Sequence, residues 1–512
     1  MSISIITLGI LTIFVKLLGL AREIVLSYYY GASHVSDAFL ISYTIPGTLF
    51  SIISVVIATG FIPIFTSILV KEGEKNANDF LSKVLIIVIT ISSLLTLISL
   101  FFSNQIVSLF ISSDNLAQLE LTSNLTNISI LSLLFIGICN VLTSYLQLQK
   151  KFMVVVLLGM PLNLSIIVFI YLSFVLDKVE LIAWGLVVSP ITQLMFLFFF
   201  MRKQNYRFKI PNFKIDNNIK GLFLFSVPMF ISIIFSQINL IIDRNLASKS
   251  QVGAISALNY SNRLVFFIQS ISITTVLTVV FPILSRLIAE KKTENFKKML
   301  DRTTFFFNVI TIPLIGSVLL FSNEIVSLVY QRGAFSIKDS VLTNSIFVYY
   351  IIGLYGIAFR ELYLNALYAL QESKSAMLNS VISIIINIIL SIILFNILGL
   401  IGIAIATAFS VLLCAVLLYF SLKRKIKIKF FETHIRSLFF TTLSTIFMLF
   451  YMKLLYSTLE NKLEDIFNFI LVFSTGYLLY FIVLKKMNLR EMQDVSLMNF
   501  ISVLIKRRKN NY

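Results

Sequence analysis

The chain consists of long apolar runs separated by short polar breaks, and this pattern restricts its fold more than any other feature. Hydrophobic residues make up 58% and charged residues 13% of the 512 residues. A soluble domain is about 45–50% apolar and about 25% charged, so its interior is too small for this much apolar surface. About 20 apolar residues in a helix cross a bilayer core. The sequence therefore predicts an all-α polytopic membrane protein.

We expect fourteen transmembrane helices, because fourteen apolar runs are long enough to span. The first run has neither a basic n-region nor a small-residue cleavage site, which predicts a retained helix rather than a signal peptide. An even number of spans places both termini on one side of the membrane. The predicted spans are 3–28, 35–69, 80–110, 119–148, 152–176, 179–201, 221–247, 252–288, 303–329, 340–371, 375–397, 399–422, 436–457 and 465–484.

The net charge of +18 is distributed unevenly along the chain. Loops after even-numbered spans with the adjoining span ends, including the tail from Lys485, hold 30 Lys and Arg residues, whereas those after odd-numbered spans hold six. Basic loops of membrane proteins remain in the cytoplasm. We therefore expect both termini to be cytoplasmic, and we attribute the charge to topology rather than to nucleic-acid binding.

An internal repeat divides the chain into two halves. Ser103–Leu109 reads SNQIVSL and Ser322–Leu328 reads SNEIVSL, with six of seven residues identical. The segments FIPIF (61–65) and VFPIL (280–284) match at the same offset of 219 residues. We expect a first six-helix lobe over 1–215, a second over 216–430 and a terminal hairpin over 431–486. Six spans are an even number, so the two lobes are parallel repeats, an arrangement found in transporters.

Three cations lie inside predicted spans, where lipid tails disfavour them. Lys16 and Arg22 belong to the first span, in IFVKLLGLAREIVL, and Arg263 to the eighth. Together they cost about 8–10 kcal/mol if nothing compensates them. Either they snorkel or pair with other helices, or they face a water-filled cleft between the lobes. In the cleft they are expected to bind an anion such as a diphosphate, because arginine contacts phosphate bidentately.

Two carboxylates accompany these cations. Helical geometry places Lys16 and Glu23 on one face and Arg22 about 120° away from Lys16. Glu23 is therefore expected to neutralise one cation but not both, unless Gly19 bends the helix. Asp37 begins the second span. Arg360 and Glu361, adjacent in the tenth span, are expected to form a structural pair.

A second polar group lies in the later spans. Asp243, Asn387, Ser391 and Thr407 supply oxygen atoms suited to a small cation, although Ser and Thr in membrane helices often bond to their own i−4 carbonyl. Cys139 and Cys414 are expected to be free apolar-packed thiols. The sequence has no Walker loop, paired catalytic carboxylates or H-E-x-x-H, so we expect a transporter rather than an enzyme, with no cofactor other than sodium or the membrane potential for coupling.

Three segments resemble the MurJ/MviN lipid II flippase family. They are LLGLAREIVLSYYYGASHVSDAFLISYTIP (17–46), NYSNRLVFF (259–267) and VYQRGAFSIKDS (329–340), and the likeness covers nearly the whole chain. The resemblance implies a bacterial inner-membrane protein with the fold of the wider MATE and polysaccharide-flippase superfamily. It implies transfer of an undecaprenyl-diphosphate-linked cell-wall precursor between leaflets for peptidoglycan synthesis, with membrane lipids and cell-wall synthesis proteins as partners.

The resemblance also assigns residues. The essential cavity cations of the family fall on Lys16, Arg22 and Arg263, with the acidic partners on Glu23 and Asp37. Its sodium site falls on Asp243, Asn387 and Thr407, and its lipid-tail groove on 431–486. The sequence departs from the family where many relatives carry two arginines and a glutamate, because Gly47–Gly60 has no charged residue.

Three alternatives remain open from the sequence. A flippase for a lipid-linked polysaccharide repeat unit uses the same fold and is favoured by the missing charges in the second span. A cation-coupled drug antiporter requires acidic residues in the cleft, whereas the residues expected there are mostly basic. A scaffold for cell-wall enzymes would explain the duplication without transport.

Overall fold

The computed structural model describes residues 2–112, 116–202, 217–426, 431–459 and 465–486, and the regular elements over these residues are helices. The first half contains α1 (Ser2–Tyr30), α2 (His34–Val56), η1 (Ile57–Phe61), α3 (Ile62–Glu72), α4 (Glu74–Phe101), α5 (Ser103–Phe110), α6 (Leu116–Ser129), η2 (Ile130–Ser132), α7 (Leu133–Leu148), α8 (Phe152–Leu157), α9 (Gly159–Val175) and α10 (Glu180–Met201). The second half contains α11 (Asn217–Ser248), α12 (Ala254–Gln269), η4 (Ser270–Thr274), α13 (Thr275–Ala289), α14 (Thr293–Leu320), α15 (Ser322–Tyr330), α16 (Ile337–Ala369), α17 (Ser373–Leu398) and α18 (Leu400–Ile426). A final pair, α19 (Phe431–Leu459) and α20 (Asp465–Lys486), follows.

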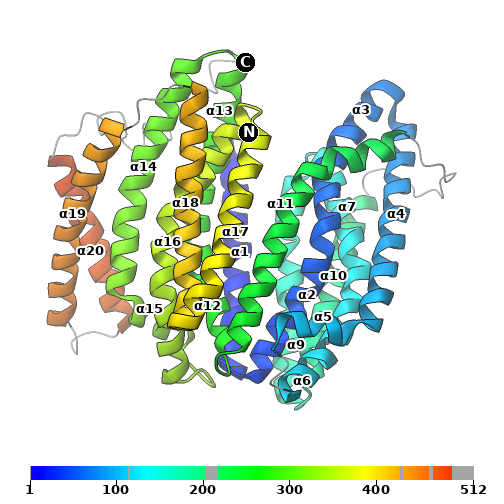
Figure 1. Ribbon diagram of the computed structural model, residues 1–512, viewed down its shortest axis with the longest axis horizontal. Coiled ribbons are helices and arrows are strands. Elements are labelled where there is room, and N and C mark those ends of the chain that lie inside the picture. The colour runs from blue at the N-terminus through cyan, green and yellow to red at the C-terminus, as the bar shows by residue number, and fades with distance from the viewer. Residues whose placement is uncertain (1, 113–115, 203–216, 427–430, 460–464, 487–512) are drawn as a thin grey trace.

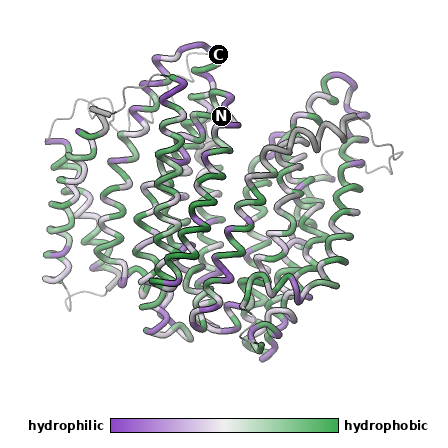
Figure 2. Tube along the Cα trace, viewed as in Figure 1, coloured by the Kyte–Doolittle hydropathy of each residue, from purple (hydrophilic) through white to green (hydrophobic). Residues whose placement is uncertain are grey.

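Eleven stretches of these helices are long and apolar enough to cross a membrane. Apolar residues line most of their length, and hydrophilic residues gather toward the two ends of the bundle (Figure 2). Helices suit this environment because each satisfies its own backbone hydrogen bonds without water. The prediction of an all-helical, multi-pass membrane protein is therefore confirmed.

The repeated segments adopt the same local structure in both halves. A π-helical turn interrupts the helix at Ile57–Phe61 in the first half and at Ser270–Thr274 in the second. Pro63 follows the first turn by two residues, and its missing N–H and its ring disrupt regular helix bonding there. Pro282 lies eight residues beyond the second turn, inside α13. The two SN-x-IVSL segments each begin a separate short helix, after a break at Phe102 or Phe321.

The two halves share a core at one end of the molecule. The largest apolar cluster contains Leu26 and Phe39 from the first half with Tyr260 and Tyr330 from the second. A second cluster contains only first-half residues, among them Tyr145. In Figure 1 the halves meet near α12 and α9 and diverge toward α3 and α13. We call the shared end the closed end (Tyr28–Asp37, Gly253–Ser256 and Arg332–Ala334).

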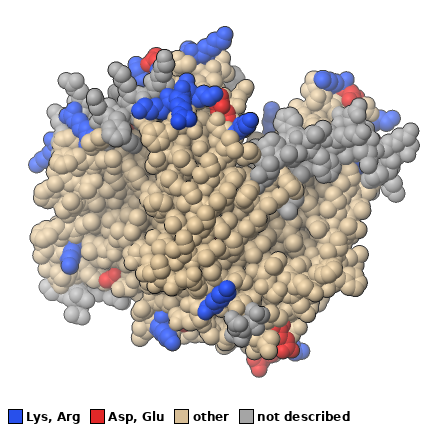
Figure 3. Space-filling view, in the orientation of Figure 1, with Lys and Arg blue, Asp and Glu red and all other residues tan. Residues whose placement is uncertain are grey.

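The opposite end, which we call the basic end, carries the turns α3–α4, α13–α14 and α16–α17. Lys and Arg side chains gather there in Figure 3, above a broad uncharged band. In the α13–α14 turn, hydrogen bonds from Lys292 and Arg286 lower the pKa of Glu290 to about 2. The predicted basic segments 203–216, 427–430 and 487–512 lie outside the described residues.

The terminal hairpin packs on the outside of the second half. α19 and α20 contact each other, and α19 lies along α14 (Figure 1). Phe305 of α14 shares a core with Met448 and Met452 of α19. The Tyr480 hydroxyl on α20 donates to Val309 O over 2.9 Å. These contacts fix the hairpin against one helix of the second half.

Candidate functional site

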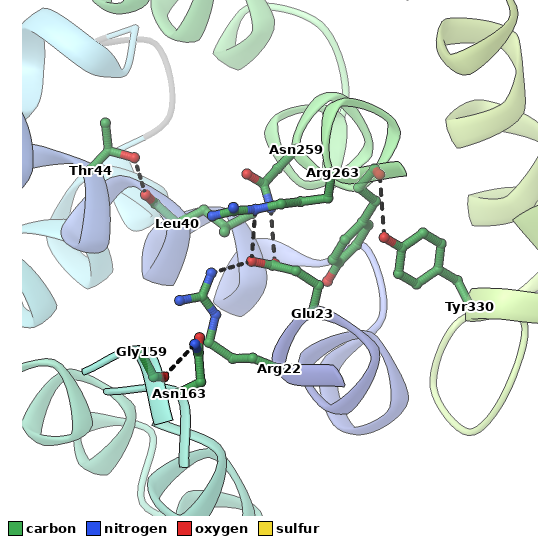
Figure 4. Close-up of polar contacts among 10 residues, drawn as sticks. Arg22, Glu23, Leu40, Thr44, Gly159, Asn163, Asn259, Arg263 and Tyr330 are labelled. Atoms are coloured by element: carbon green, nitrogen blue, oxygen red, sulfur yellow. Dashed lines mark hydrogen bonds and ion pairs between the residues drawn. The ribbon is translucent and has the colours of Figure 1, made fainter. Parts of the chain in front are cut away.

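A buried carboxylate joins the two halves about two turns before the C-terminal end of α1. Glu23, which is 1% exposed, accepts a hydrogen bond from Arg22 Nη2 at 2.5 Å. From α12 in the other half, Arg263 Nε lies 3.2 Å from Glu23 Oε1, and Asn259 Nδ2 donates to Glu23 Oε2 over 3.0 Å. Figure 4 shows all three side chains converging on this carboxylate. We call these four residues the Glu23 cluster.

Arg22 and Lys16 of α1 each lie beside an aromatic ring. The Arg22 guanidinium lies 4.9 Å from the ring centroid of Tyr43 on α2, and Arg22 is only 4% exposed. Its Nε atom is buried without a hydrogen-bond partner. Lys16 is partly exposed and lies 5.9 Å from the ring centroid of Phe266 on α12. Both contacts have the geometry of cation–π interactions.

Glu23 was expected to neutralise one of the two α1 cations, Lys16 and Arg22, and it pairs with Arg22. Its second ion pair, with Arg263 of the other half, was not expected. Arg22 is buried in this pair rather than facing water, because long side chains reach farther than backbone direction indicates. A bend at Gly19 is not needed for this contact. α1 is one continuous helix there, and Gly19 lies opposite Asn163 of α9.

Asp37 links the halves at the closed end. Its Oδ2 accepts from Gly253 N at 2.9 Å, and its Oδ1 accepts from Ser256 N at 2.7 Å and from the Ser256 hydroxyl. These backbone groups belong to the first turn of α12, whose N–H groups have no intrahelical acceptor. Asp37 on α2 therefore caps a helix of the opposite half.

Close backbone packing completes the closed end. Ala334 N donates to Tyr28 O over 2.8 Å, and the Tyr260 hydroxyl donates to Gly31 O over 3.1 Å. Gly253 has a φ of +81°, and a Cβ there would lie 2.3 Å from Ala32 O. Gly333 has a φ of +60°, and a Cβ there would lie 2.3 Å from Tyr28 O. Any larger residue at either position would push the halves apart.

A cavity of about 550 Å³ lies between the halves beside the Glu23 cluster. Arg263 and Asn259 of the cluster line it, and so does Tyr43. Of the twenty described residues that line it, only Arg244 and Arg263 are charged, so the cavity favours an anion. Lys16, Arg22 and Glu23 are not among those residues. Its lining residues are Ser42, Tyr43, Thr44, Pro46, Gly47, Thr48, Ser132, Ile136, Cys139, Asn140, Leu162, Leu186, Ser189, Pro190, Gln193, Gln237, Leu240, Arg244, Asn259 and Arg263.

The predicted cation-binding residues lie in the second half. Asn239 Nδ2 donates to Asp243 Oδ2 over 3.2 Å, and Asn387 Nδ2 donates to Ser410 Oγ over 2.8 Å. Asp243 Oδ1, Asn239 Oδ1, Asn387 Oδ1 and Ser391 Oγ are buried without a hydrogen-bond partner. They come from α11 and α17, which pack together. Unpartnered buried oxygens of this kind suit a small hard cation.

The Thr407 hydroxyl, unlike these oxygens, already has a hydrogen-bond partner. It donates to Ile403 O, four residues earlier, over 2.9 Å. The described residues contain no group of three or more His, Cys, Asp and Glu side chains that would bind a transition metal. Cys139 and Cys414 are buried free thiols.

Sequence reasoning missed three residues near the cavity. Asn259 lies one helical turn before Arg263 in NYSNRLVFF, so the i, i+4 spacing could have identified it. Tyr43 has no such signal, because its contact with Arg22 depends on how α1 and α2 pack. Arg244 was not assigned to the cleft, but it lines the cavity and donates to Ile255 O over 3.1 Å. Arg360 Nη2 pairs with Glu361 Oε1 at 2.7 Å, which confirms that predicted pair.

Comparison with known proteins agrees with this architecture. The family model described as lipid II flippase MurJ matches residues 26–474. A probable lipid II flippase MurJ of Buchnera aphidicola is 27% identical over 391 residues, 74% of this chain and 75% of the relative. The Treponema pallidum protein of the same name is 27% identical over 452 residues, 86% of this chain and 85% of the relative.

Solved structures of related proteins also match this chain over most of its length. Lipid II flippase MurJ in an inward closed conformation matches with a TM-score of 0.80 and 26% identity, covering 93% of this chain and 98% of that one. An inward-facing multidrug resistance MATE family transporter matches with a TM-score of 0.69 and 13% identity, over 81% and 94%. The second match concerns the fold alone. The first, together with the family model and the sequence relatives, establishes that the chain belongs to the MurJ lipid II flippase family.

Proposed function

We propose that this protein moves lipid II, an undecaprenyl-diphosphate-linked cell-wall precursor, from the inner to the outer leaflet of a bacterial cytoplasmic membrane. The observation that carries the proposal is the cavity between the halves, whose described lining has two arginines and no carboxylate. A diphosphate is the anionic part of such a lipid, and arginine binds phosphate oxygens bidentately. A drug antiporter for cations would need acidic groups in this lining.

The Glu23 cluster supports a partner-exchange step for the anion. In the structure Glu23 neutralises Arg263, whose side chain is 32% exposed and lines the cavity. A diphosphate entering the cavity would replace Glu23 as the partner of Arg263. Arg22 Nε, which is buried and unpartnered, would then be available from the other half. Ligand binding would thus reorganise contacts that join the two halves, with Lys16 as a further cation near Phe266.

The closed end supports alternating access. The Asp37 cap and the Tyr28–Ala334 hydrogen bond hold the halves together at that end in this state. Exposure of the headgroup on the other side would require both contacts to break while the basic end closes, in the manner of rocking lobes. A ligand drives such a change only through its differential affinity for the two states. Membrane potential would contribute about 2.3 kcal/mol for each charge that crosses 100 mV.

The topology that fits this function has fourteen spans. To the eleven apolar stretches we add α1, the continuous α2–η1–α3 helix and α11. The halves 1–215 and 216–430 would then be parallel lobes, and both termini, including the tail 487–512, would be cytoplasmic. The Lys and Arg side chains at the basic end support this orientation (Figure 3). The closed end would face outward.

The terminal hairpin over 431–486 is proposed to accommodate the polyprenyl tail. Phe439, Phe450 and Ile470 on α19 and α20 are more than half exposed, as expected of a lipid-facing surface. Membrane lipids are therefore its natural contact, and cell-wall synthesis proteins are proposed as partners.

A small cation, sodium by preference, is proposed to bind the unpartnered oxygens of Asp243, Asn387 and Ser391. It would neutralise the Asp243 carboxylate inside the second half and stabilise the α11–α17 contact. Thr407 would join only by giving up its bond to Ile403 O.

Complementation tests the function directly. The endogenous lipid II flippase of a bacterium would be depleted while this chain is expressed, with membrane insertion checked by a C-terminal tag. We expect growth and cell shape to be restored. Failure by a well-expressed, correctly inserted protein would contradict lipid II as the substrate, and restored polysaccharide export in a strain lacking a repeat-unit flippase would support the alternative substrate.

A further inference from the structure

The cavity is polarised between its two walls. Both charged lining residues, Arg244 on α11 and Arg263 on α12, belong to the second half. The first-half wall, formed by α2, α7 and α10, has hydroxyl and amide side chains but no charge among its described residues. A headgroup that carries charge at one end only would therefore bind in one orientation.

Amide side chains on the first-half wall are held in place by the protein. Asn140 Nδ2 on α7 donates to Ser54 Oγ over 3.1 Å. Gln193 Nε2 on α10 donates to Leu158 O over 2.9 Å. Each amide carries both donors and acceptors, so a single protein contact leaves capacity for a ligand. Groups held in this way lose little entropy when they bind.

Two polar atoms of the lining are buried without any partner. They are Thr48 Oγ1 on α2 and Gln237 Oε1 on α11. Thr44, one turn before Thr48, is satisfied by donating to Leu40 O over 2.6 Å (Figure 4). Buried polar atoms in folded proteins usually have a partner, and exceptions indicate a ligand or water.

The geometry points to a carbohydrate subsite on the first-half wall, formed by Thr48, Asn140 and Gln193. This inference rests on the proposed function and specifies how the headgroup lies. The diphosphate contacts Arg263 and Arg244, and the adjoining N-acetylated sugar binds the opposite, uncharged wall. Hydroxyl and acetamido groups donate and accept without charge, as these side chains do. A volume of about 550 Å³ is in the range of small-ligand sites.

The absence of charged residues in Gly47–Gly60 is consistent with a wall that binds an uncharged sugar. A wall without charge gains nothing from a charged peptide and recognises the sugar through hydrogen bonds alone. The subsite therefore selects for the glycan next to the diphosphate. Substrates that share this sugar and differ farther along would be accepted alike.

Two lipids that differ only in the group on the diphosphate, a methyl or a sugar, test the subsite. Binding of the methyl ester of undecaprenyl diphosphate, which has the same charge as the sugar-bearing lipid, and of undecaprenyl diphosphate N-acetylglucosamine to the purified full-length protein would be measured in nanodiscs. We expect the wild type to prefer the sugar-bearing lipid about tenfold, as a few neutral hydrogen bonds allow. The double variant Asn140→Leu/Gln193→Leu should lose this preference and keep its affinity for the methyl ester of undecaprenyl diphosphate, which also shows that it is folded.

Two further variants separate the possible outcomes. Asn379→Leu removes an amide that donates to Ser421 Oγ over 2.7 Å away from the cavity, and it should keep the preference. Arg263→Gln should weaken the binding of both lipids by the same factor. A wild type without preference, or a double variant that retains it, would overturn the subsite and leave the proposed function standing. A wild type that binds neither lipid would overturn the proposed function itself.

Discussion

The helix formed by α2, η1 and α3 in the first half has a counterpart in α12, η4 and α13 of the second. Both are interrupted by a π-helical turn ahead of a proline, and both line the cavity. They differ in charge, because α12 contributes Arg263 where α2 contributes only uncharged groups such as Thr44 and Thr48. Duplication thus provides two similar walls of the cavity. Divergence of a few side chains gives one wall arginines that can bind an anion and leaves the other wall uncharged.

The halves also differ in how they use an adjacent Arg–Glu pair. The side chains of Arg22 and Glu23 are at most 5% exposed, and Glu23 reaches across to Arg263. Arg360 and Glu361 have the same spacing and a similar distance, but about a third of each side chain is exposed. The first pair therefore joins the halves, whereas the second is a local contact.

The largest effect is expected from Glu23→Gln. It leaves Arg22 as a buried charge without its carboxylate, which should reduce the free energy of unfolding by about 3–5 kcal/mol. Thermal unfolding in detergent and lipid II transport would both be measured. Glu361→Gln is the matched control and should cost at most about 1 kcal/mol, because its pair is partly exposed. Equal losses in the two variants would remove the distinction between the pairs.

An intermediate effect is expected from Asp37→Asn. The amide cannot accept all three hydrogen bonds from Gly253 and Ser256. The free energy that holds the halves together at the closed end should therefore fall by about 1–3 kcal/mol. Spin labels at Lys178 and Lys338, exposed at that end in opposite halves, should show a larger population of long distances. Asp339→Asn disrupts a capping box within α16 alone and should leave the distances unchanged. Identical distributions for Asp37→Asn and the wild type would mean that the cap does not hold the halves.

The smallest effect is expected from Asp243→Asn. If sodium binds the unpartnered oxygens, it should increase the free energy of unfolding of the wild type by about RT ln(1 + [L]/Kd). The melting temperature should therefore be higher in 100 mM NaCl than in 100 mM choline chloride. The variant should lose this difference, because it lacks the carboxylate. A sodium-dependent shift of the same size in Asp243→Asn would place the cation elsewhere.

The helices and the repeat were predictable because they depend on local pattern. Apolar runs determine which segments are helical in lipid, and the matching SN-x-IVSL segments adopt matching short helices. Arg263 at a cavity between halves also followed from the cost of burying a cation. The duplicated π-helical turns were not predicted, since Pro63 explains a disruption near the first turn but not its form, and Pro282 lies eight residues beyond the second turn.

Contacts between distant helices were less predictable. A helical wheel places Arg22 and Glu23 in different directions around α1. Both side chains are long enough to meet, and Glu23 also reaches Arg263 of the other half. The Asp37 cap depends on α12 beginning beside α2, which no spacing in the chain records. Thr407 bonded to its own i−4 carbonyl, the local alternative that the sequence had left open.

Transport by purified protein tests most directly whether second-half arginines bind the diphosphate in the cavity. Transfer of fluorescent lipid II across proteoliposomes would be compared for the wild type, Arg263→Gln and Arg360→Gln. Arg360 lies outside the described cavity lining and provides the matched loss of one charge. We expect transport by Arg263→Gln to fall to the rate of protein-free vesicles and transport by Arg360→Gln to remain within about twofold of the wild type. Wild-type transport by Arg263→Gln would contradict this role of the arginines.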